Sequence, residues 1–413
     1  MDTSCLLKWL QDYYQADVYT LTLDVGQREN KLEEVRKKAL ELGAAGAFVA
    51  DIKEDFATEY VSEAIKANAL YQGQYPLSTA IARPLKSQVA VEIAKEEGID
   101  AIAHGSTGKG NDQVRFEVSI KALDGEIKVL APVRDWNMTR DKEIAYAEEK
   151  GIPVPVDVDS PYSIDENLWG RSIECGVLED PYAEPPDEVY ELTNPISETP
   201  EEPDYVTIHF QAGLPYKLDD REMDLIELIE ELNELAGKHG VGQIDMVEDR
   251  VVGLKSREIY ECPAAITIIK AHQDLEKFCC TSHENNFKAT IEEKWAQMAY
   301  QGLMFDPLMA DLSAYLDQVN GKVQGKVKLK LFKGQAKVVG RTSKNGLYKH
   351  SLATYDAGSS FDQKASEGFI QIWGLPTEVA RRSENGQYSA QDEEEEAGGE
   401  IEGQSLEAKG VGT

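Results

Sequence analysis

The side chains best able to do chemistry are concentrated in one segment, AHGSTGKGNDQVRFE, which runs from Ala103 to Glu117. A Walker-type phosphate loop needs four residues between its first glycine and a Gly-Lys pair, followed by Ser or Thr. Here only two residues separate Gly105 from Gly108, and Gly110 follows Lys109, so that motif is absent. We also expect no helix in the register that a GxGxxG dinucleotide loop requires. The segment is therefore not predicted to hold a phosphate tail.

The composition of this segment instead fits an amino acid that carries both charges. Glycine lets the backbone approach a ligand closely. Arg115 can bind a carboxylate through two hydrogen bonds, and Asp112 can accept a hydrogen bond from an ammonium group. Thr107 and Asn111 add neutral polar groups. A zwitterionic amino acid is the ligand that this set favours, although a solvated loop would explain the same polarity.

Two more polar runs occur farther along the chain, PYSIDENLWGRS at 161–172 and VEDRVVGLKSREIYE at 247–261. The first is also typical of a turn rich in Asp and Asn, and the second of a charged strand at the edge of a sheet. Neither run indicates chemistry alone. The sequence supports no Ser-His-Asp or Cys-His set.

The elements that must position these segments are clearest in residues 1–155. Strands that alternate with helices of roughly 10–15 residues predict a parallel sheet covered on both faces. The polar loops at 24–27 and 104–110 would then lie beyond the carboxyl ends of strands, where such sheets bind ligands. The expected strands are 17–25, 47–51, 99–105 and 127–133. The expected helices are a short one through Leu6, Leu7 and Leu10, followed by 31–43, 55–70, 85–98 and 139–151. The helix at 55–70 would place Phe56, Tyr60, Ala64 and Ala67 on one buried face.

Residues 156–375 predict a second domain of the α+β class. Hairpins are expected at 205–218 and 321–343, a helix at 224–236, and strands with turns at 244–261. In the later hairpin, alternation would turn Val327, Leu329 and Leu331 toward the core and the intervening lysines toward solvent. Residues 376–413 would form a C-terminal arm and an acidic, Gly-rich tail that is expected to be disordered from about 383.

Composition excludes several classes of partner. The net charge of −32 argues against nucleic acid and against an anionic membrane. No apolar run is long enough to span a membrane, and the N-terminus does not resemble a signal peptide. The five cysteines form no CxxC pair and the six histidines are scattered. We therefore predict a cytoplasmic protein with no metal site, no nucleic-acid partner and no membrane partner.

Taken together, the polar runs occur in the order and spacing of the argininosuccinate synthase family. The resemblance covers about residues 2–378 and is carried by MDTSCLLKWL, DVGQ, ANALYQGQYPLSTAIARP, AHGSTGKGNDQVRFE, PYSIDENLWGRSIECGVLEDP, VEDRVVGLKSREIYECPAA and EGFIQIWGLP. It implies a Rossmann-like, parallel-sheet nucleotide-binding domain of the ATP-pyrophosphatase type, then an α+β synthetase and multimerisation domain, and a C-terminal arm.

The resemblance also implies an activity and a set of site residues. The reaction would join L-citrulline to L-aspartate through a citrullyl-adenylate, releasing AMP and pyrophosphate. Mg–ATP would be a substrate, no cofactor would be tightly bound, and the chain would form a homotetramer. Catalysis would rest on positioning and charge, with Asp112 and Arg115 as catalytic residues. Citrulline would meet Tyr75, Asn111, Arg115, Ser163, Ser172, Glu248 and Tyr260; aspartate would meet Thr107, Asn111 and Asp112; ATP would meet Asp2, Thr3, Ser4 and Gly105.

The N-terminus departs from the family. Most relatives carry Ser-Gly-Gly-Leu-Asp-Thr-Ser after a first hydrophobic strand, whereas this chain begins Met1-Asp2-Thr3-Ser4. We therefore expect the first domain to lack its first strand and its phosphate loop, and to bind ATP more weakly. Two explanations stay open: a natural chain that starts upstream, which we favour because the other sites look intact, or an inactive relative that binds citrulline or aspartate without ATP turnover. Another ATP-pyrophosphatase-type ligase is a third alternative, and the acidic charge weighs against one that modifies tRNA.

Three smaller departures touch the substrate pockets. Ala80 stands where relatives often have Ser near citrulline, and Leu23 stands where many have Ala near adenine. Asp249 stands where many have Asn, and it adds negative charge beside Glu248. We expect these changes to alter affinity.

Overall fold

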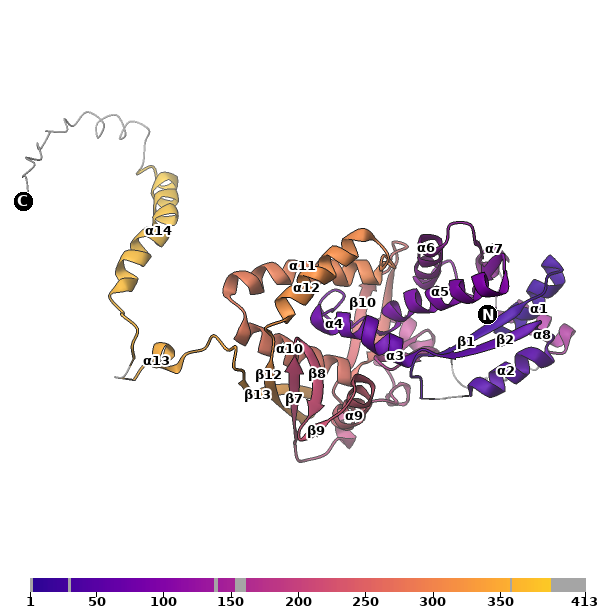
Figure 1. Cartoon of the computed structure of the whole chain (residues 1–413), viewed down its shortest axis with the longest axis horizontal. Coiled ribbons are helices and arrows are strands. Elements are labelled where there is room, and N and C mark those ends of the chain that lie inside the picture. Colours follow the sequence, from indigo (N-terminus) through magenta and orange to yellow (C-terminus); the bar gives the residue numbers. More distant parts are fainter. Residues whose placement is uncertain (1–2, 29–30, 137–139, 153–160, 357–358, 388–413) are drawn as a thin grey trace, which may run out of the picture. The chain divides into compact units, whose positions relative to one another are not determined.

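A computed structural model of the chain describes residues 3–28, 31–136, 140–152, 161–356 and 359–387. The chain forms two compact units, Met1–Leu347 and Tyr348–Thr413 (Figure 1). The domain boundary predicted near residue 155 falls within 153–160, outside the described residues.

The first part of the large unit alternates strands and helices, as the sequence predicts. Its elements are α1 (Thr3–Tyr14), β1 (Tyr19–Asp24), α2 (Leu32–Glu41), β2 (Gly46–Asp51), β3 (Ala101–Ala103), α6 (Asp112–Leu123), β4 (Lys128–Leu130), α7 (Pro132–Trp136) and α8 (Arg140–Lys150). β1 pairs with β2 and β3 pairs with β4, both in parallel, which confirms the expected α/β class. Over the described residues these strands form two separate pairs and not one continuous sheet.

Helix α1 connects the two strand pairs through its apolar face. Leu6, Trp9 and Leu10 are buried and pack both against Val18, which precedes β1, and against residues of β3 and β4. The predicted helix near the N-terminus is therefore confirmed, with its three-to-four-residue spacing facing inward.

The segment between β2 and β3 is helical throughout most of its length. It contains α3 (Lys53–Asp55), a π-helix (Phe56–Val61), α4 (Ser62–Lys66) and α5 (Ser78–Glu97). Phe56, Tyr60, Ala64 and Ala67 are buried, as predicted. Helix α5 starts earlier than the sequence indicates and holds Pro84 in its interior. A proline there removes one backbone donor, so burial of most of the helix's first half must outweigh that loss.

The second part of the large unit contains two antiparallel sheets. One has the order β10-β11-β6-β5 and the other the order β13-β12-β7-β8-β9. The elements are β5 (Ser163–Asn167), β6 (Gly170–Glu174), three 3-10 turns (Gly176–Glu179, Asp187–Val189, Ile196–Glu198), β7 (Asp204–Gln211), β8 (Leu214–Leu218), β9 (Arg221–Glu222), α9 (Leu225–Lys238), β10 (Gln243–Asp249), β11 (Lys255–Glu261), α10 (Pro263–Cys279), α11 (Ser282–Tyr300), α12 (Pro307–Asn320), β12 (Gly325–Phe332) and β13 (Gln335–Thr342). Both predicted hairpins and the helix at 224–236 are confirmed.

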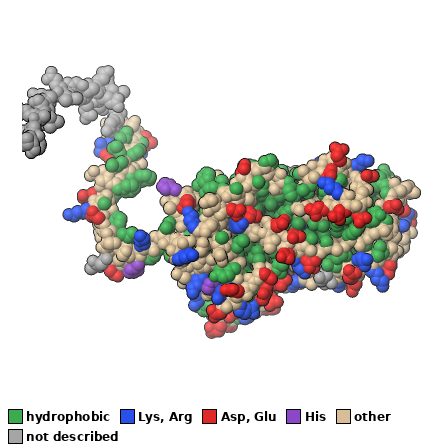
Figure 2. Space-filling model, in the orientation of Figure 1, with side chains coloured by type: hydrophobic (Ala, Val, Ile, Leu, Met, Phe, Trp, Pro, Cys, Tyr) green, Lys and Arg blue, Asp and Glu red, His purple; other side chains and the backbone are tan. Residues whose placement is uncertain are grey.

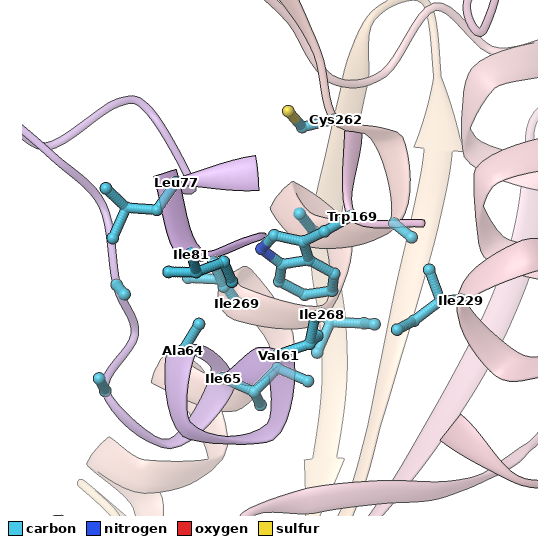
Figure 3. Packing of buried hydrophobic residues seen from close by; sticks show 14 of the residues in the cluster. Val61, Ala64, Ile65, Leu77, Ile81, Trp169, Ile229, Cys262, Ile268 and Ile269 are labelled. Carbon is cyan, nitrogen blue, oxygen red and sulfur yellow. The ribbon is translucent and has the colours of Figure 1, made fainter. Parts of the chain in front are cut away.

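The largest core is shared by both parts of this unit. Val327, Leu329 and Leu331 of β12 are fully buried, as the alternating pattern predicts, and the sheet packs on α9 and α10. Trp169, in the turn between β5 and β6, is also fully buried, and Figure 3 shows its indole among Val61, Ile268 and Ile269. One cluster therefore joins the segment after β2 to the two sheets.

The loop after β1 is hydrogen-bonded to the β5–β6 hairpin and packs closely against it. The N–H of Leu168 donates to the carbonyl oxygen of Val25 (2.9 Å), and Gly26 lies so close that an added Cβ would sit 2.8 Å from the Leu168 Cβ. Gly26 also has a φ of +87°, which only glycine adopts easily. Arg28 binds Glu166 through its backbone N–H (2.9 Å) and its Nε (3.0 Å). The loop at 24–28 is thus fixed relative to the first antiparallel sheet.

The small unit contains α13 (His350–Ala353) and α14 (Ala365–Glu384). No residue of α14 is buried. Residues 388–413, where most of the predicted disordered tail falls, are outside the described residues. In the part of the chain that the structure describes, no helix is long and apolar enough to cross a membrane.

Candidate active site

The segment with which the sequence analysis began is a loop that follows β3 and leads into α6. The Nε2 of Gln113 in the first turn of α6 donates to the carbonyl oxygens of Gly108 (2.7 Å) and Gly110 (3.3 Å). We expected no helix in a dinucleotide register after this loop, yet a helix begins at Asp112. The prediction was wrong because Val114, Phe116, Val118 and Ile120 alternate with polar residues, a pattern typical of a strand.

Asp112 is held between two guanidinium groups. Its Oδ2 accepts hydrogen bonds from Arg83 Nη2 (2.7 Å) and Nε (2.9 Å), and its Oδ1 accepts one from Arg115 Nη1 (3.1 Å). Burial would raise the pKa of the Asp112 carboxyl, but the two guanidinium groups outweigh burial and hold that pKa far below its usual range. Asp112 is therefore an anion near neutral pH. It can accept a hydrogen bond from an ammonium group, and it cannot act as a general base.

Arg83 and Asp165 are functional candidates that sequence reasoning missed. Arg83, on α5, is buried and also pairs with Asp165 on β5. Its guanidinium carbon lies 5.6 Å from the centroid of the Phe116 ring. Arg83 lies in the run STAIARP and Asp165 in the run PYSIDENL. Each is a charged residue, in a run that resembles the family, to which the sequence analysis gave no role. Nothing in one sequence says that Arg83 lies between Asp112 and Asp165 and binds both.

Tyr300, the last residue of α11, lies at the centre of the polar network. Its hydroxyl accepts a hydrogen bond from Asn111 Nδ2 (2.7 Å) and donates to Glu248 Oε1. Its carbonyl oxygen accepts from Arg115 Nε (2.9 Å), and its ring stacks on Tyr71 with centroids 3.5 Å apart. Sequence reasoning missed Tyr300 because the helix that carries it has no motif of polar residues.

Glu248 is a buried carboxylate that two tyrosines satisfy. It is 2% exposed, and its Oε2 accepts from the Tyr260 hydroxyl (2.7 Å) while its Oε1 accepts from Tyr300. Burial raises the pKa of both phenols, and the neighbouring Glu248 carboxylate raises it further. Both hydroxyls therefore stay protonated and keep donating to the carboxylate. Tyr75 stacks on the Tyr260 ring at 3.9 Å.

Ser172 extends this network to α5. It lies opposite Tyr260 in the β6–β11 register, and its hydroxyl is 3.2 Å from Thr79 Oγ1. The Thr79 N–H donates to the Tyr75 hydroxyl (2.9 Å). The first turn of α5 thus connects the tyrosine pair to the middle of the first antiparallel sheet.

The structure brings most of the predicted site residues into this one network and leaves some outside it. Thr107 is exposed in the loop after β3, and Ser163 is exposed at the start of β5, opposite Glu174. Gly105 is half-buried directly after His104, and Ser4 lies in the first turn of α1. Asp2 and the side chain of Thr3 are outside the described residues. The residues joined by hydrogen bonds, ring stacking or strand register are Tyr75, Asn111, Asp112, Arg115, Ser172, Glu248 and Tyr260.

The three residues that depart from the family pattern differ in how far they are buried and in what they contact. Asp249 is exposed and binds Gln72 (2.7 Å) and Lys255, because adjacent residues of a strand point to opposite faces. Its charge is therefore directed away from Glu248. Ala80 is fully buried, with its N–H 3.4 Å from the Tyr75 hydroxyl. Leu23 is half-buried near the end of β1.

Lys86 carries a charge that no ion pair offsets within the described ranges. It lies one turn beyond Arg83 on α5. Burial, together with the positive charge of Arg83, lowers the pKa of the Lys86 ammonium to about 8. Below pH 8 the folded state therefore holds an unfavourable charge. We expect Lys86→Met to raise the free energy of unfolding by about 1–2 kcal/mol at pH 7.

The pH dependence makes this prediction specific. As the pH rises from 8 toward the ordinary lysine value of 10.5, the wild-type lysine becomes neutral in the folded state and then in the unfolded state. The advantage of Lys86→Met should shrink over the same range. Urea titrations at pH 7 and pH 10 measure this difference, with Lys95→Met, an exposed lysine of the same helix, as the control. An equal gain at both pH values would contradict the prediction.

Two family models match most of the chain. The model described as Arginosuccinate synthase N-terminal HUP domain matches residues 1–153, and the model described as Arginosuccinate synthase C-terminal domain matches residues 162–380. The argininosuccinate synthase of Oceanobacillus iheyensis is 54% identical over 379 residues, which are 92% of this chain and 91% of that protein. Similar matches are the argininosuccinate synthases of Pyrococcus furiosus (53% over 389 residues, 94% of each chain) and Nostoc punctiforme (52% over 383 residues, 92% of this chain and 96% of that protein).

Proposed function

Because the chain belongs to the argininosuccinate synthase family, whose ligases serve arginine biosynthesis, we propose that it joins L-citrulline to L-aspartate at the expense of ATP. In this reaction the ureido oxygen of citrulline attacks the α-phosphorus of ATP, and pyrophosphate leaves. The aspartate amine then attacks the ureido carbon of the citrullyl-adenylate. AMP leaves with the ureido oxygen, and argininosuccinate remains.

The observation that carries this proposal is that Asp112 and Arg115 of α6 converge with Glu248 of β10, through Tyr300 at the end of α11. A buried carboxylate with two phenol donors suits the ammonium group of citrulline, and Arg115 has further N–H groups for its carboxylate. Asp112 suits the ammonium group of aspartate, beside Thr107 and Asn111. No covalent bond to the protein is needed, so the rate would come from positioning and charge.

The nucleotide would bind beyond the carboxyl ends of the parallel strands, near Asp2, Thr3, Ser4 and Gly105. Mg–ATP is a substrate in this proposal, and no tightly bound cofactor takes part. The five cysteines are free thiols, which supports a reducing compartment such as the cytoplasm.

A labelled substrate tests the proposed reaction. Citrulline carrying ¹⁸O in its ureido group, incubated with the purified protein, Mg–ATP and aspartate, should transfer that oxygen to AMP. Mass spectrometry of AMP and of the condensed product measures the transfer. Binding of citrulline and aspartate in calorimetry without any AMP would instead support a binding protein and overturn the ligase proposal.

We also propose that the chain forms a homotetramer, which helix α14 supports. Among the described residues of Tyr348–Thr413, this helix carries Phe369, Ile370, Ile372, Trp373 and Leu375, each more than half exposed. Figure 2 shows hydrophobic side chains on the surface of this helix. An amphipathic helix with this much exposed apolar surface requires a partner. The partner in this proposal is another copy of the chain.

Replacing Phe369 and Trp373 by Ser should dissociate the assembly. The two rings stack on one face of α14 at 5.5 Å, and each contributes about 1.5–3 kcal/mol when fully buried. Light scattering coupled to gel filtration should show the mass of four chains for the wild type and a smaller mass for the double variant. Glu378→Ser, on the same helix, is the control and should keep the wild-type mass. A monomeric wild type would contradict the tetramer proposal.

A further inference from the structure

The turn between β10 and β11 is hydrogen-bonded to the loop that follows β3. The N–H of Val251 donates to Asn111 Oδ1 (2.8 Å), and Arg250 Nη1 donates to the carbonyl oxygen of Lys109 (3.2 Å). These contacts fix the amide of Asn111, whose Nδ2 then faces the Tyr300 hydroxyl. They also hold the backbone directly before Asp112. The turn therefore sets the position of the loop.

Arg250 is itself anchored to two strands. Its Nη2 donates to Glu174 Oε2 on β6 (2.5 Å) and to Glu258 Oε1 on β11 (2.7 Å), and its Nε donates to Ser256 Oγ (2.8 Å). Glu258 is buried and also accepts a hydrogen bond from Ser256 (2.9 Å). One guanidinium group thus connects the first antiparallel sheet to the loop.

We propose that Arg250 is a positioning residue for aspartate: it holds the Lys109–Asp112 backbone in the geometry that presents Asn111 and Asp112 to the aspartate ammonium group. This inference rests on the proposed function. Asn111 is assigned to both amino acids, but three other groups assigned to citrulline are held differently. Tyr75, Ser172 and Tyr260 are joined to each other through Thr79, through ring stacking and through strand pairing, and Arg250 donates to none of them.

Lysine cannot replace this arginine. A guanidinium group has five N–H donors in a planar fork, whereas an ammonium group is a single point with a shorter reach. Arg250→Lys can satisfy the carboxylates of Glu174 and Glu258, but it cannot bind them and the Lys109 carbonyl oxygen at once. The variant keeps the charge and loses the connection to the loop.

Steady-state kinetics of the full chain test the inference. Arg250→Lys should raise the KM for aspartate about tenfold and the KM for citrulline only about threefold, because citrulline shares Asn111 but not Asp112. Arg257→Lys is the matched control, because Arg257 lies on the same sheet, pairs with Asp245 and donates to the carbonyl oxygens of Asp180 and Ala183. It should leave both KM values unchanged. Equal changes in the two KM values for Arg250→Lys, or no change, would overturn the inference.

A second variant decides the matter if Arg250→Lys does not fold. Burial raises the pKa of Glu258 to about 8, and the carboxylates of Glu174 and Glu248 raise it while Arg250 lowers it. The charged fraction of Glu258 therefore rises between pH 7 and pH 9, and the charged form holds Arg250 more strongly. The ratio of the Glu258→Gln KM for aspartate to the wild-type KM should therefore be larger at pH 9 than at pH 7, by about threefold. The inference would be overturned if the ratio of the variant KM to the wild-type KM for aspartate were the same at pH 7 and pH 9.

The two proposals can fail separately. A wild-type protein that forms no argininosuccinate would overturn the proposed function. An active wild type whose Arg250→Lys variant loses affinity for both amino acids alike would leave the function standing and remove only the role of Arg250.

Discussion

Asp112→Asn should lower kcat/KM for aspartate by roughly a hundredfold to a thousandfold, because it removes the anion assigned to the aspartate ammonium group. The same substitution leaves Arg115 without its paired carboxylate and leaves Arg83 with Asp165 alone. The amide keeps the size of the side chain, so the loss reflects charge and not volume. Initial rates at saturating citrulline and ATP, with aspartate varied, measure the effect.

Asp249→Asn is the matched control for this prediction. Asp249 is exposed and lies beside Glu248 in sequence, but its side chain binds Lys255 and Gln72 on the outer face. We expect this change to alter kcat/KM less than about threefold. If Asp112→Asn had no larger effect than Asp249→Asn, the assignment of Asp112 to aspartate would be wrong.

Asp112→Asn should also change the acid stability of the protein. The pKa of Asp112 is lowered in the folded state, so this group stabilises the fold above its ordinary value near 3.8 and loses that contribution as the pH falls. The variant should therefore lose less stability than the wild type between pH 5 and pH 3. Thermal unfolding at several acidic pH values measures the difference.

Trp169→Ala should lower the free energy of unfolding by about 3–5 kcal/mol, the second large effect that we predict. The indole is fully buried in the cluster that joins the segment after β2 to the two sheets (Figure 3). Its Nε1 also donates to the carbonyl oxygen of Pro76 (2.9 Å), directly before α5. Removal of the ring leaves a cavity and an unpaired carbonyl group. Equilibrium urea unfolding followed by circular dichroism measures the loss.

Trp169→Phe separates the two contributions. Phenylalanine retains most of the ring volume but cannot donate to Pro76, so we expect a loss of about 1–2 kcal/mol. Because Pro76, which Trp169 holds, directly follows the Tyr71–Tyr75 turn, Trp169→Ala should also reduce activity at temperatures where the protein is still folded. A loss below about 1 kcal/mol for Trp169→Ala would contradict the central place of this residue in the core.

Patterns with a short period were the most informative part of the sequence. The alternation of Val327, Leu329 and Leu331 with lysines predicts a strand with one buried face, and the structure confirms it. The prediction works because successive side chains of a strand point to opposite faces of the sheet. The start of α5 was misplaced because Pro84 normally marks a helix start, whereas here tertiary burial keeps it in the interior.

The candidate site was predictable only in part. Asn111, Asp112, Arg115 and Glu248 stood out because they belong to dense polar runs. Arg83 and Tyr300 did not, since a single arginine in a helix and a tyrosine at a helix end have many ordinary roles. Their importance comes from contacts with residues far away in the chain, and one sequence contains no measure of such distances.

The hydrogen bond from Arg115 to the Tyr300 carbonyl oxygen spans 185 positions of the chain, and the one from Asn111 to the Tyr300 hydroxyl spans 189. A nascent polypeptide therefore exposes the arginine and aspartate of α6 long before the ribosome has made the helix that covers them. Until then these charges have only each other and Arg83 as neighbours. The polar network around Tyr300 can therefore close only after residue 300 has been made.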